Sequence, residues 1–189
     1  LKQGLRGFYS QNTAAICGHT DVANSKATWL TRMQSQQYFI AFKTFKSLEG
    51  FFRSVICCSG AFSLYRTDSI RPLIEEWENQ SFLGRSRTFG DDRGLTNLLL
   101  REGYDTIYVS EAKAKTIVPQ NAKTYLRQQL RWRRSFLMES LSGLSHMWKR
   151  PIGASVMFYM VLSLTLMSPF VVSYFLLVGP IVDSLNPLV

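Results

Sequence analysis

The chain has 189 residues, enough for one domain of moderate size or for part of a larger protein. Its formal net charge of +9 indicates an anionic partner, such as a polyanion, a membrane surface or a phosphorylated substrate. The three cysteines, with Cys57 next to Cys58, make a poor disulfide framework and indicate a reducing compartment. The two histidines stand in no Cys/His ligand spacing, which argues against a zinc site. Because the chain begins at Leu1 and stops just after an apolar run, we expect a piece of a longer protein.

The first third of the chain alternates strand and helix signals. Residues 14–17 are small and apolar and predict a buried strand. Residues 25–49 have helical spacing, and the helix is expected to end at Gly50. Residues 54–58 predict a second buried strand, which Ser59 and Gly60 break. The residues of the helix that we expect to pack into the core are Trp29, Met33, Ile40 and Phe51.

The middle third continues the alternation. Thr67, Asp68 and Ser69 can cap a helix that runs towards Trp77, and a polar loop follows over residues 79–88. A leucine-rich helix then begins after Gly90 and stops at Gly103, and residues 106–109 predict another strand. Strands interleaved with helices predict an α/β domain whose sheet is largely covered on both faces.

The last third carries a basic helix and then an apolar run. Between residues 123 and 150 stand seven Lys and Arg residues and one acid, Glu139. Residues 152–182 contain no charged residue, and about 20 apolar residues suffice to span a bilayer. We predict one transmembrane helix over about residues 154–178, kinked at Pro169. The basic flank places the preceding part in the cytosol, because cytosolic flanks of membrane spans carry such excesses.

These observations divide the chain into four parts. Residues 1–120 are expected to be part of a cytosolic α/β domain, and residues 121–150 to be basic amphipathic helices at the membrane interface. Residues 151–182 are the transmembrane segment, and residues 183–189 are a tail.

Asp91, Asp92 and Arg93 enter the leucine-rich helix together. Paired carboxylates suit a general base that deprotonates a hydroxyl nucleophile while its neighbour shapes the local field. Gly90 before them lets the backbone approach a ligand closely. The alternative is an ordinary acidic helix start, since carboxylates there complement the helix dipole.

Two further elements offer ligand chemistry. Ser59 and Gly60 follow a predicted strand, where ligands of open α/β sheets gather, although the segment is equally consistent with a simple turn. Gln128, Arg131 and Trp132 share one helical face, on which Arg can clamp a diphosphate and Trp can stack on a sugar. The alternative for this helix is an interfacial anchor in lipid headgroups.

In order and spacing, the three elements together resemble the processive family-2 glycosyltransferases. Residues 79–84, 89–97 and 124–132 closely resemble hyaluronan synthases, and residues 51–58 with the Gln-rich helix also resemble rhizobial chitooligosaccharide synthases. The resemblance covers roughly residues 14–134. The chain departs from the family at Gly94, where a His is frequent, and at Ala61, where a Pro is common.

The resemblance implies a Rossmann-like glycosyltransferase domain of the GT-A type, of which residues 1–120 are the C-terminal half. It also implies a set of roles. Asp92 is expected to be the catalytic base, with Asp91 as its acidic neighbour. Gln128, Arg131 and Arg93 are expected to bind the diphosphate of the donor. The residues expected to hold the acceptor end are Trp132, Cys58, Ser59 and Gly60. Mg²⁺ or Mn²⁺ is expected as a cofactor, with its ligands in a segment before Leu1, so no residue of this chain is assigned to the metal.

The resemblance further implies an inverting β-glycosyltransferase that polymerises sugars from UDP-activated donors. The expected product is hyaluronan from UDP-GlcNAc and UDP-glucuronate, and the alternative is a chitin oligomer from UDP-GlcNAc alone. The expected partners are the growing polysaccharide and the lipid bilayer. The expected location is the plasma membrane, which the full-length protein is expected to cross several times.

Two interpretations from other classes stay open. A nucleic-acid-binding module fits the charge, but the basic residues adjoin a membrane run rather than a groove lined with aromatics, so no nucleic acid is expected. A membrane-anchored interaction protein would make the acidic pair and the Gln128-to-Trp132 spacing coincidental.

Overall fold

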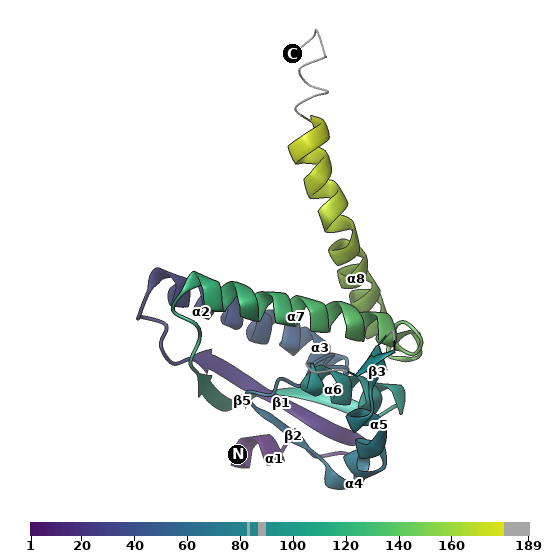
Figure 1. The fold of residues 1–189 in the computed structure, drawn as a ribbon. Coiled ribbons are helices and arrows are strands. Elements are labelled where there is room, and N and C mark those ends of the chain that lie inside the picture. The colour runs from purple at the N-terminus through teal and green to yellow at the C-terminus, as the bar shows by residue number, and fades with distance from the viewer. Residues whose placement is uncertain (83, 87–89, 180–189) are drawn as a thin grey trace.

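In the computed structural model, which describes residues 1–82, 84–86 and 90–179, a mixed three-stranded sheet has the order β2-β1-β5 (Figure 1). The central strand β1 (Thr13–Val22) pairs antiparallel with β2 (Ser63–Tyr65) and parallel with β5 (Asp105–Thr116). Nearly every residue of β1 is buried, as expected for a strand covered on both faces. The predicted α/β class is confirmed, and both strands predicted around residues 14–17 and 106–109 are present and longer than expected.

One long helical stretch carries α2 (Trp29–Ile40), the π-helical η1 (Ala41–Lys46) and α3 (Ser47–Phe51). Thr28 caps its start through a reciprocal capping box with Thr31. The helix passes through Gly50, so the predicted end is one residue early.

The face of this stretch that was expected in the core is largely exposed, with Trp29 77% and Phe51 79% accessible. The buried face instead consists of Leu30, Gln34 and Phe42, which are spaced by multiples of four residues along the helix.

The predicted strand over residues 54–58 is wrong. Only Ser54 makes an isolated bridge, to Thr106. From Ile56 on, two backbone N–H groups of the segment bond to side chains instead of to a neighbouring strand. The Ile56 N–H donates to Glu49 and the Cys58 N–H donates to Thr96. The segment is therefore a loop whose position depends on neighbouring helices.

The next helix is broken into α4 (Thr67–Ile70), the 3₁₀ turn η2 (Arg71–Leu73) and α5 (Ile74–Glu78). No side chain caps α4, so the predicted capping by residues 67–69 is wrong. The break includes Pro72, which has no N–H to continue an α-helix. Part of the predicted loop over 79–88 forms a small hairpin of β3 (Ser81–Phe82) and β4 (Arg85–Ser86), and the rest lies outside the described residues.

Helix α6 (Asp91–Arg101) begins at Gly90 and is followed by Gly103; both glycines have positive φ, +90° and +83°. Its leucines enter the main core between helices and sheet, which includes Phe42, Leu98 and Leu99. The short helix α1 (Lys2–Leu5) lies on the other side of the sheet from α2 and α7 (Ala122–Gly143) (Figure 1).

After α7 the chain turns through η3 (Met147–Lys149) into α8 (Ile152–Ser173), which continues as the π-helical η4 (Tyr174–Val178). Figure 1 shows α8 rising away from the α/β part, so most of its side chains are exposed. A second core cluster of Leu100, Met147, Phe158 and Leu162 fixes the base of α8.

The helix continues through Pro169. This proline removes the N–H that would bind the Thr165 carbonyl, and the Ser168 hydroxyl donates to that carbonyl instead, at 3.0 Å. The predicted long apolar helix is confirmed, since residues Ile152–Val178 are long and apolar enough to cross a membrane.

Candidate active site

The start of α6 brings a predicted base and a predicted acceptor loop into contact. The Asp92 carboxylate accepts the backbone N–H of Arg93 at 2.8 Å on one oxygen and the N–H of Gly60 at 3.0 Å on the other. Its position in the first helical turn adds the favourable field of the helix dipole. Asp91 is exposed, and its backbone carbonyl accepts the Trp77 indole N–H at 2.9 Å. The two acids therefore differ: one is fixed and the other is open to solvent.

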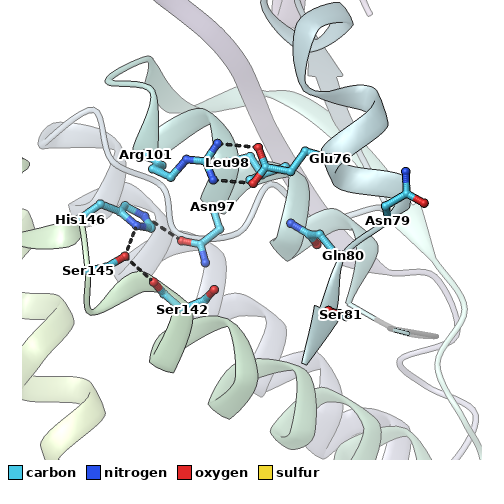
Figure 2. Close-up of a pocket in the computed structure, with 10 residues that line it drawn as sticks. All are labelled: Glu76, Asn79, Gln80, Ser81, Asn97, Leu98, Arg101, Ser142, Ser145 and His146. Carbon is cyan, nitrogen blue, oxygen red and sulfur yellow. Dashed lines mark hydrogen bonds and ion pairs between the residues drawn. The ribbon is translucent and has the colours of Figure 1, made fainter. Parts of the chain in front are cut away.

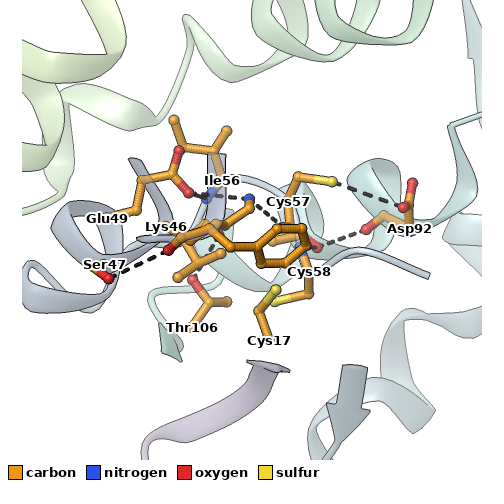
Figure 3. Close-up of polar contacts among 12 residues, drawn as sticks. Cys17, Lys46, Ser47, Glu49, Ile56, Cys57, Cys58, Asp92 and Thr106 are labelled. Carbon is orange, nitrogen blue, oxygen red and sulfur yellow. Dashed lines mark hydrogen bonds and ion pairs between the residues drawn. The ribbon is translucent and has the colours of Figure 1, made fainter. Parts of the chain in front are cut away.

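The loop of residues 56–60 is held from both sides (Figure 3). The Lys46 ammonium donates to the Cys57 carbonyl at 2.5 Å, and Thr96 accepts the Cys58 N–H at 3.0 Å. The Thr96 hydroxyl also donates to the Asp92 carbonyl at 2.6 Å, which ties the loop to α6. Desolvation raises the pKa of both Cys57 and Cys58, so both thiols stay protonated at neutral pH and neither is an activated nucleophile.

Helix α7 supplies the opposite wall. Its start is fixed by Asn121, whose side chain accepts the Thr124 N–H at 2.9 Å. Trp132 is 40% exposed, and its ring centroid lies 6.4 Å from that of Tyr38 on α2. The Arg93 guanidinium lies over the Phe136 ring, 5.2 Å from its centroid. Among the described residues, the Arg131 side chain has no hydrogen-bond or ion-pair partner, so its donors are available to a ligand.

These groups surround one cavity of about 780 Å³, a size typical of small-molecule sites. Of the predicted site residues, those that line it are Ser59, Gly60, Asp91, Asp92, Arg93, Arg131 and Trp132. The cavity thus has two carboxylates and Arg93 at one end of α6, and Arg131 with the aromatic ring of Trp132 on α7. That combination suits an anionic ligand that also carries a sugar.

Two predicted residues are not in the lining. Cys58 belongs to the loop of residues 56–60, but it is fully buried. Gln128 points elsewhere, and its side-chain oxygen is buried without a hydrogen-bond partner among the described residues. Gln129, its neighbour, lines the cavity in its place. The roles of all the predicted site residues stay predictions.

Sequence reasoning missed several cavity residues, chiefly Tyr38, Lys46, Cys57 and Ser135. The first two come from the α2–η1 stretch, where an i, i+4, i+8 spacing of Tyr38, Phe42 and Lys46 was the available signal. Ser135 could be identified only from the fold, which brings it next to Gly90. The two residues are so close that a Cβ at Gly90 would overlap the Ser135 hydroxyl.

A smaller polar cavity of about 350 Å³ lies at the other end of α6 (Figure 2). Here the buried His146 contacts the Asn97 amide oxygen at 3.0 Å, and the Asn97 amide donates to the Glu139 carboxylate at 3.0 Å. Desolvation, with the nearby positive charges of Arg101 and Arg150, lowers the pKa of His146 to about 4. Arg101 forms a two-bond ion pair with Glu76. These polar groups bind one another.

Within the described residues, no group of three or more His, Cys, Asp or Glu side chains could hold a metal ion. Asp91 and Asp92 alone do not make the oxygen-rich set that Mg²⁺ or Mn²⁺ requires. We therefore assign no metal to this site and derive no step from one.

Comparison with known proteins identifies the family. The chitin synthase family matches residues 8–185, which is nearly the whole chain. The chain belongs to the chitin synthase family. Sequence relatives of this chitin synthase-family chain include an N-acetylglucosaminyltransferase of Azorhizobium caulinodans, 44% identical over 66% of this chain and 31% of that protein.

The relatives come from two branches. An N-acetylglucosaminyltransferase of Sinorhizobium fredii is 40% identical over 72% of this chain and 33% of its own length. A hyaluronan synthase of Streptococcus pyogenes is 36% identical over 82% of this chain and 36% of its own length. The predicted resemblance to family-2 glycosyltransferases of both branches is confirmed. The chain spans about a third of the length of these curated relatives.

Proposed function

We propose that this chain forms the acceptor-side part of a membrane-embedded, processive, inverting β-glycosyltransferase that polymerises sugars from UDP-sugar donors. The observation that carries the proposal is the contact between Asp92 and Gly60, inside a cavity that Arg131 and Trp132 also line. Asp92 is a fixed carboxylate, and Arg131 in the same cavity has no hydrogen-bond or ion-pair partner among the described residues. This arrangement is suited to joining a hydroxyl acceptor to a diphosphate-activated donor.

The chemistry follows from these positions. The Asp92 carboxylate takes the proton of the acceptor hydroxyl as its oxygen attacks the anomeric carbon in line with the departing diphosphate. One C–O bond forms, the bond to the diphosphate oxygen breaks, and inversion gives the β linkage. Arg131 and Arg93 bind the charge that develops on the leaving group, and Trp132 stacks on the acceptor sugar. The N–H groups of Gly60 and Arg93 each donate to a different oxygen of Asp92, which leaves further lone pairs of the carboxylate for the hydroxyl.

The transferred unit that we favour first is N-acetylglucosamine from UDP-GlcNAc, because the rhizobial relatives are N-acetylglucosaminyltransferases. A chain of this unit alone would be a chitin oligomer. Hyaluronan, which also needs UDP-glucuronate, is the second candidate, and the match to the streptococcal hyaluronan synthase over 82% of this chain favours it.

The membrane setting is part of the proposal. Helix α7 carries exposed Arg127, Arg131, Arg133 and Arg134 immediately before α8, the helix apolar enough to cross a bilayer. This arrangement supports a cytosolic catalytic part at the inner surface of the plasma membrane, in a full-length protein that crosses it several times. We propose the same four segments, with boundaries at residues 120, 150 and 182; the starts of α7 and α8 support the first two, and the third lies outside the described residues.

The test uses the full-length protein in membranes with labelled UDP-GlcNAc, with and without UDP-glucuronate. Polymer formed from UDP-GlcNAc alone, and digested by chitinase, is the outcome expected for the first candidate. Polymer that requires both donors and is digested by hyaluronidase would establish the second. Absence of any polymer from protein that is folded and inserted would refute the proposed function.

A further inference from the structure

The loop of residues 56–60 is fixed by β2, whose Ser63 and Tyr65 hydroxyls donate to its carbonyls, and by two separate helical elements. On the α6 side, Asp92 binds the Gly60 N–H and Thr96 binds the Cys58 N–H. On the other side, the hydrogen bonds come from η1 and α3. Because the loop makes no sheet ladder after Ser54, these side chains replace the strand partners that would otherwise fix it.

The η1–α3 side consists of one ion pair, Lys46 and Glu49. The two charged groups lie 3.2 Å apart, and their side chains are only 14% and 12% exposed. Each also binds the loop: Lys46 donates to the Cys57 carbonyl at 2.5 Å, and Glu49 accepts the Ile56 N–H at 3.2 Å. Figure 3 shows both contacts converging on consecutive residues of the loop.

The pair is costly to bury, which argues for a specific role. Two ions removed from water lose several kcal/mol of hydration each, and apolar residues of similar volume are often as stable. Burial by itself would lower the pKa of Lys46, but the charge of the Glu49 carboxylate outweighs it and keeps the ammonium charged. A charged Lys46 gives the shortest hydrogen bond of the loop.

We propose that Lys46 and Glu49 are positioning residues that hold the Ile56–Cys57 end of the loop so that Gly60 keeps the Asp92 carboxylate aimed into the cavity. Lys46 also lines that cavity. The inference rests on the proposed function, because it assigns the pair a part in the reaction at Asp92. Without the pair, the loop keeps its contacts with α6 and β2 and loses those with η1 and α3.

The experiment compares Lys46→Met with the double variant Lys46→Met/Glu49→Met in the full-length protein. The single variant leaves the Glu49 carboxylate buried and unpaired, so we expect a large loss of Tm, about 5–10 °C. The double variant removes both charges and should recover most of that loss. Synthesis should not recover: we expect kcat to stay about 10- to 100-fold low in both variants with the donor KM within about twofold of wild type.

A merely structural role predicts the opposite pattern, in which kcat returns together with Tm in the double variant. That result would overturn the inference. Lys43→Met is the matched control, because Lys43 is an exposed lysine on the same η1 helix, and we expect no change in either quantity.

Hydrogen–deuterium exchange of the peptide containing residues 56–60 tests the inference without relying on synthesis. Exchange should be about tenfold faster in both the single and the double variant and unchanged in Lys43→Met. Unchanged exchange in the double variant would refute the positioning role even if the wild-type protein makes no polymer. Polymer from wild type, with normal kcat and exchange in the double variant, would refute this inference alone and leave the proposed function intact.

Discussion

The two cavities at opposite ends of α6 differ in how their polar groups are partnered. At the smaller one, Asn97 joins His146 to Glu139, and Arg101 pairs with Glu76. At the larger one, Arg131 and the Asp91 carboxylate have no hydrogen-bond or ion-pair partner among the described residues. Both groups are exposed at the cavity, so their hydrogen-bonding capacity is available to a ligand rather than used within the protein.

If the proposed function is correct, the comparison distinguishes a structural polar site from a ligand-binding one in the same molecule. Both lie against α7, both are rich in charge, and composition alone does not distinguish them. In the smaller cavity the polar groups bind one another and fix α6 against the turn into α8, whereas the larger cavity has polar groups available to a ligand. Substitutions at the two ends should therefore affect different quantities.

The largest effect is expected for Asp92→Asn in the full-length protein. An amide cannot take the acceptor proton, so the rate of polymer synthesis should fall about 10²- to 10⁴-fold. The measurement is incorporation of labelled sugar in membranes. Asp68→Asn, which changes an exposed acid at the start of α4, is the control and should leave the rate unchanged. Full activity in Asp92→Asn would contradict the role of this carboxylate and the contrast between the cavities.

Arg131→Ala is expected to have the next largest effect. A charged hydrogen bond to a diphosphate contributes about 1.5–3 kcal/mol, so kcat/KM for the donor should fall about 10- to 100-fold. Initial rates over a range of UDP-sugar concentrations check this. Arg127→Ala removes a neighbouring exposed arginine of α7 outside the cavity lining and is the control. Equal losses in the two variants would show that α7 acts through total charge rather than through one site.

Local spacing explains why much of this site was predictable. Asp91 and Asp92 are adjacent, and Arg131 and Trp132 share a helical face whatever the fold around them. Family resemblance then related these elements to one another. The same reasoning placed Gln128 with them, but the structure turns Gln129 to the cavity, because the exact rotation of α7 depends on packing against α2 and α6.

The errors have a common physical cause in tertiary contacts. Residues 54–58 have a strand-like composition, yet Glu49 and Thr96 bind the backbone groups of this segment. Lys46 and Glu49 bind a loop about ten residues further along the chain. Helical periodicity could therefore show only that they lie on a polar face of their helix, not what they bind. Trp29 and Phe51 were expected in the core, and hydrophobicity alone could not reveal that they are exposed.

Asn97→Leu should affect stability rather than chemistry. It leaves the buried Glu139 carboxylate and the His146 ring without the amide that binds both, which should cost about 2–3 kcal/mol of unfolding free energy. Chemical denaturation measures this loss, and Asn79→Leu, at an exposed position of the same cavity, should stay within about 0.5 kcal/mol of wild type. The activity per folded molecule should be unchanged. A selective loss of kcat would mean that the smaller cavity also serves the reaction.

The smallest expected effect is the pH dependence that His146 imparts. Its pKa is lowered from the ordinary value of 6.5 to about 4 in the folded protein, so the unfolded chain binds this proton more readily. The stability that comes from keeping the ring neutral is complete above about pH 6.5 and decreases as the pH falls towards 4, with a loss of about 2 kcal/mol by about pH 5. Thermal unfolding of wild type and His146→Gln over this range should show a steeper decrease for wild type. Parallel curves would mean that the ring is already charged in the folded protein, and that the contact with Asn97 is not the neutral hydrogen bond on which the contrast between the two cavities depends.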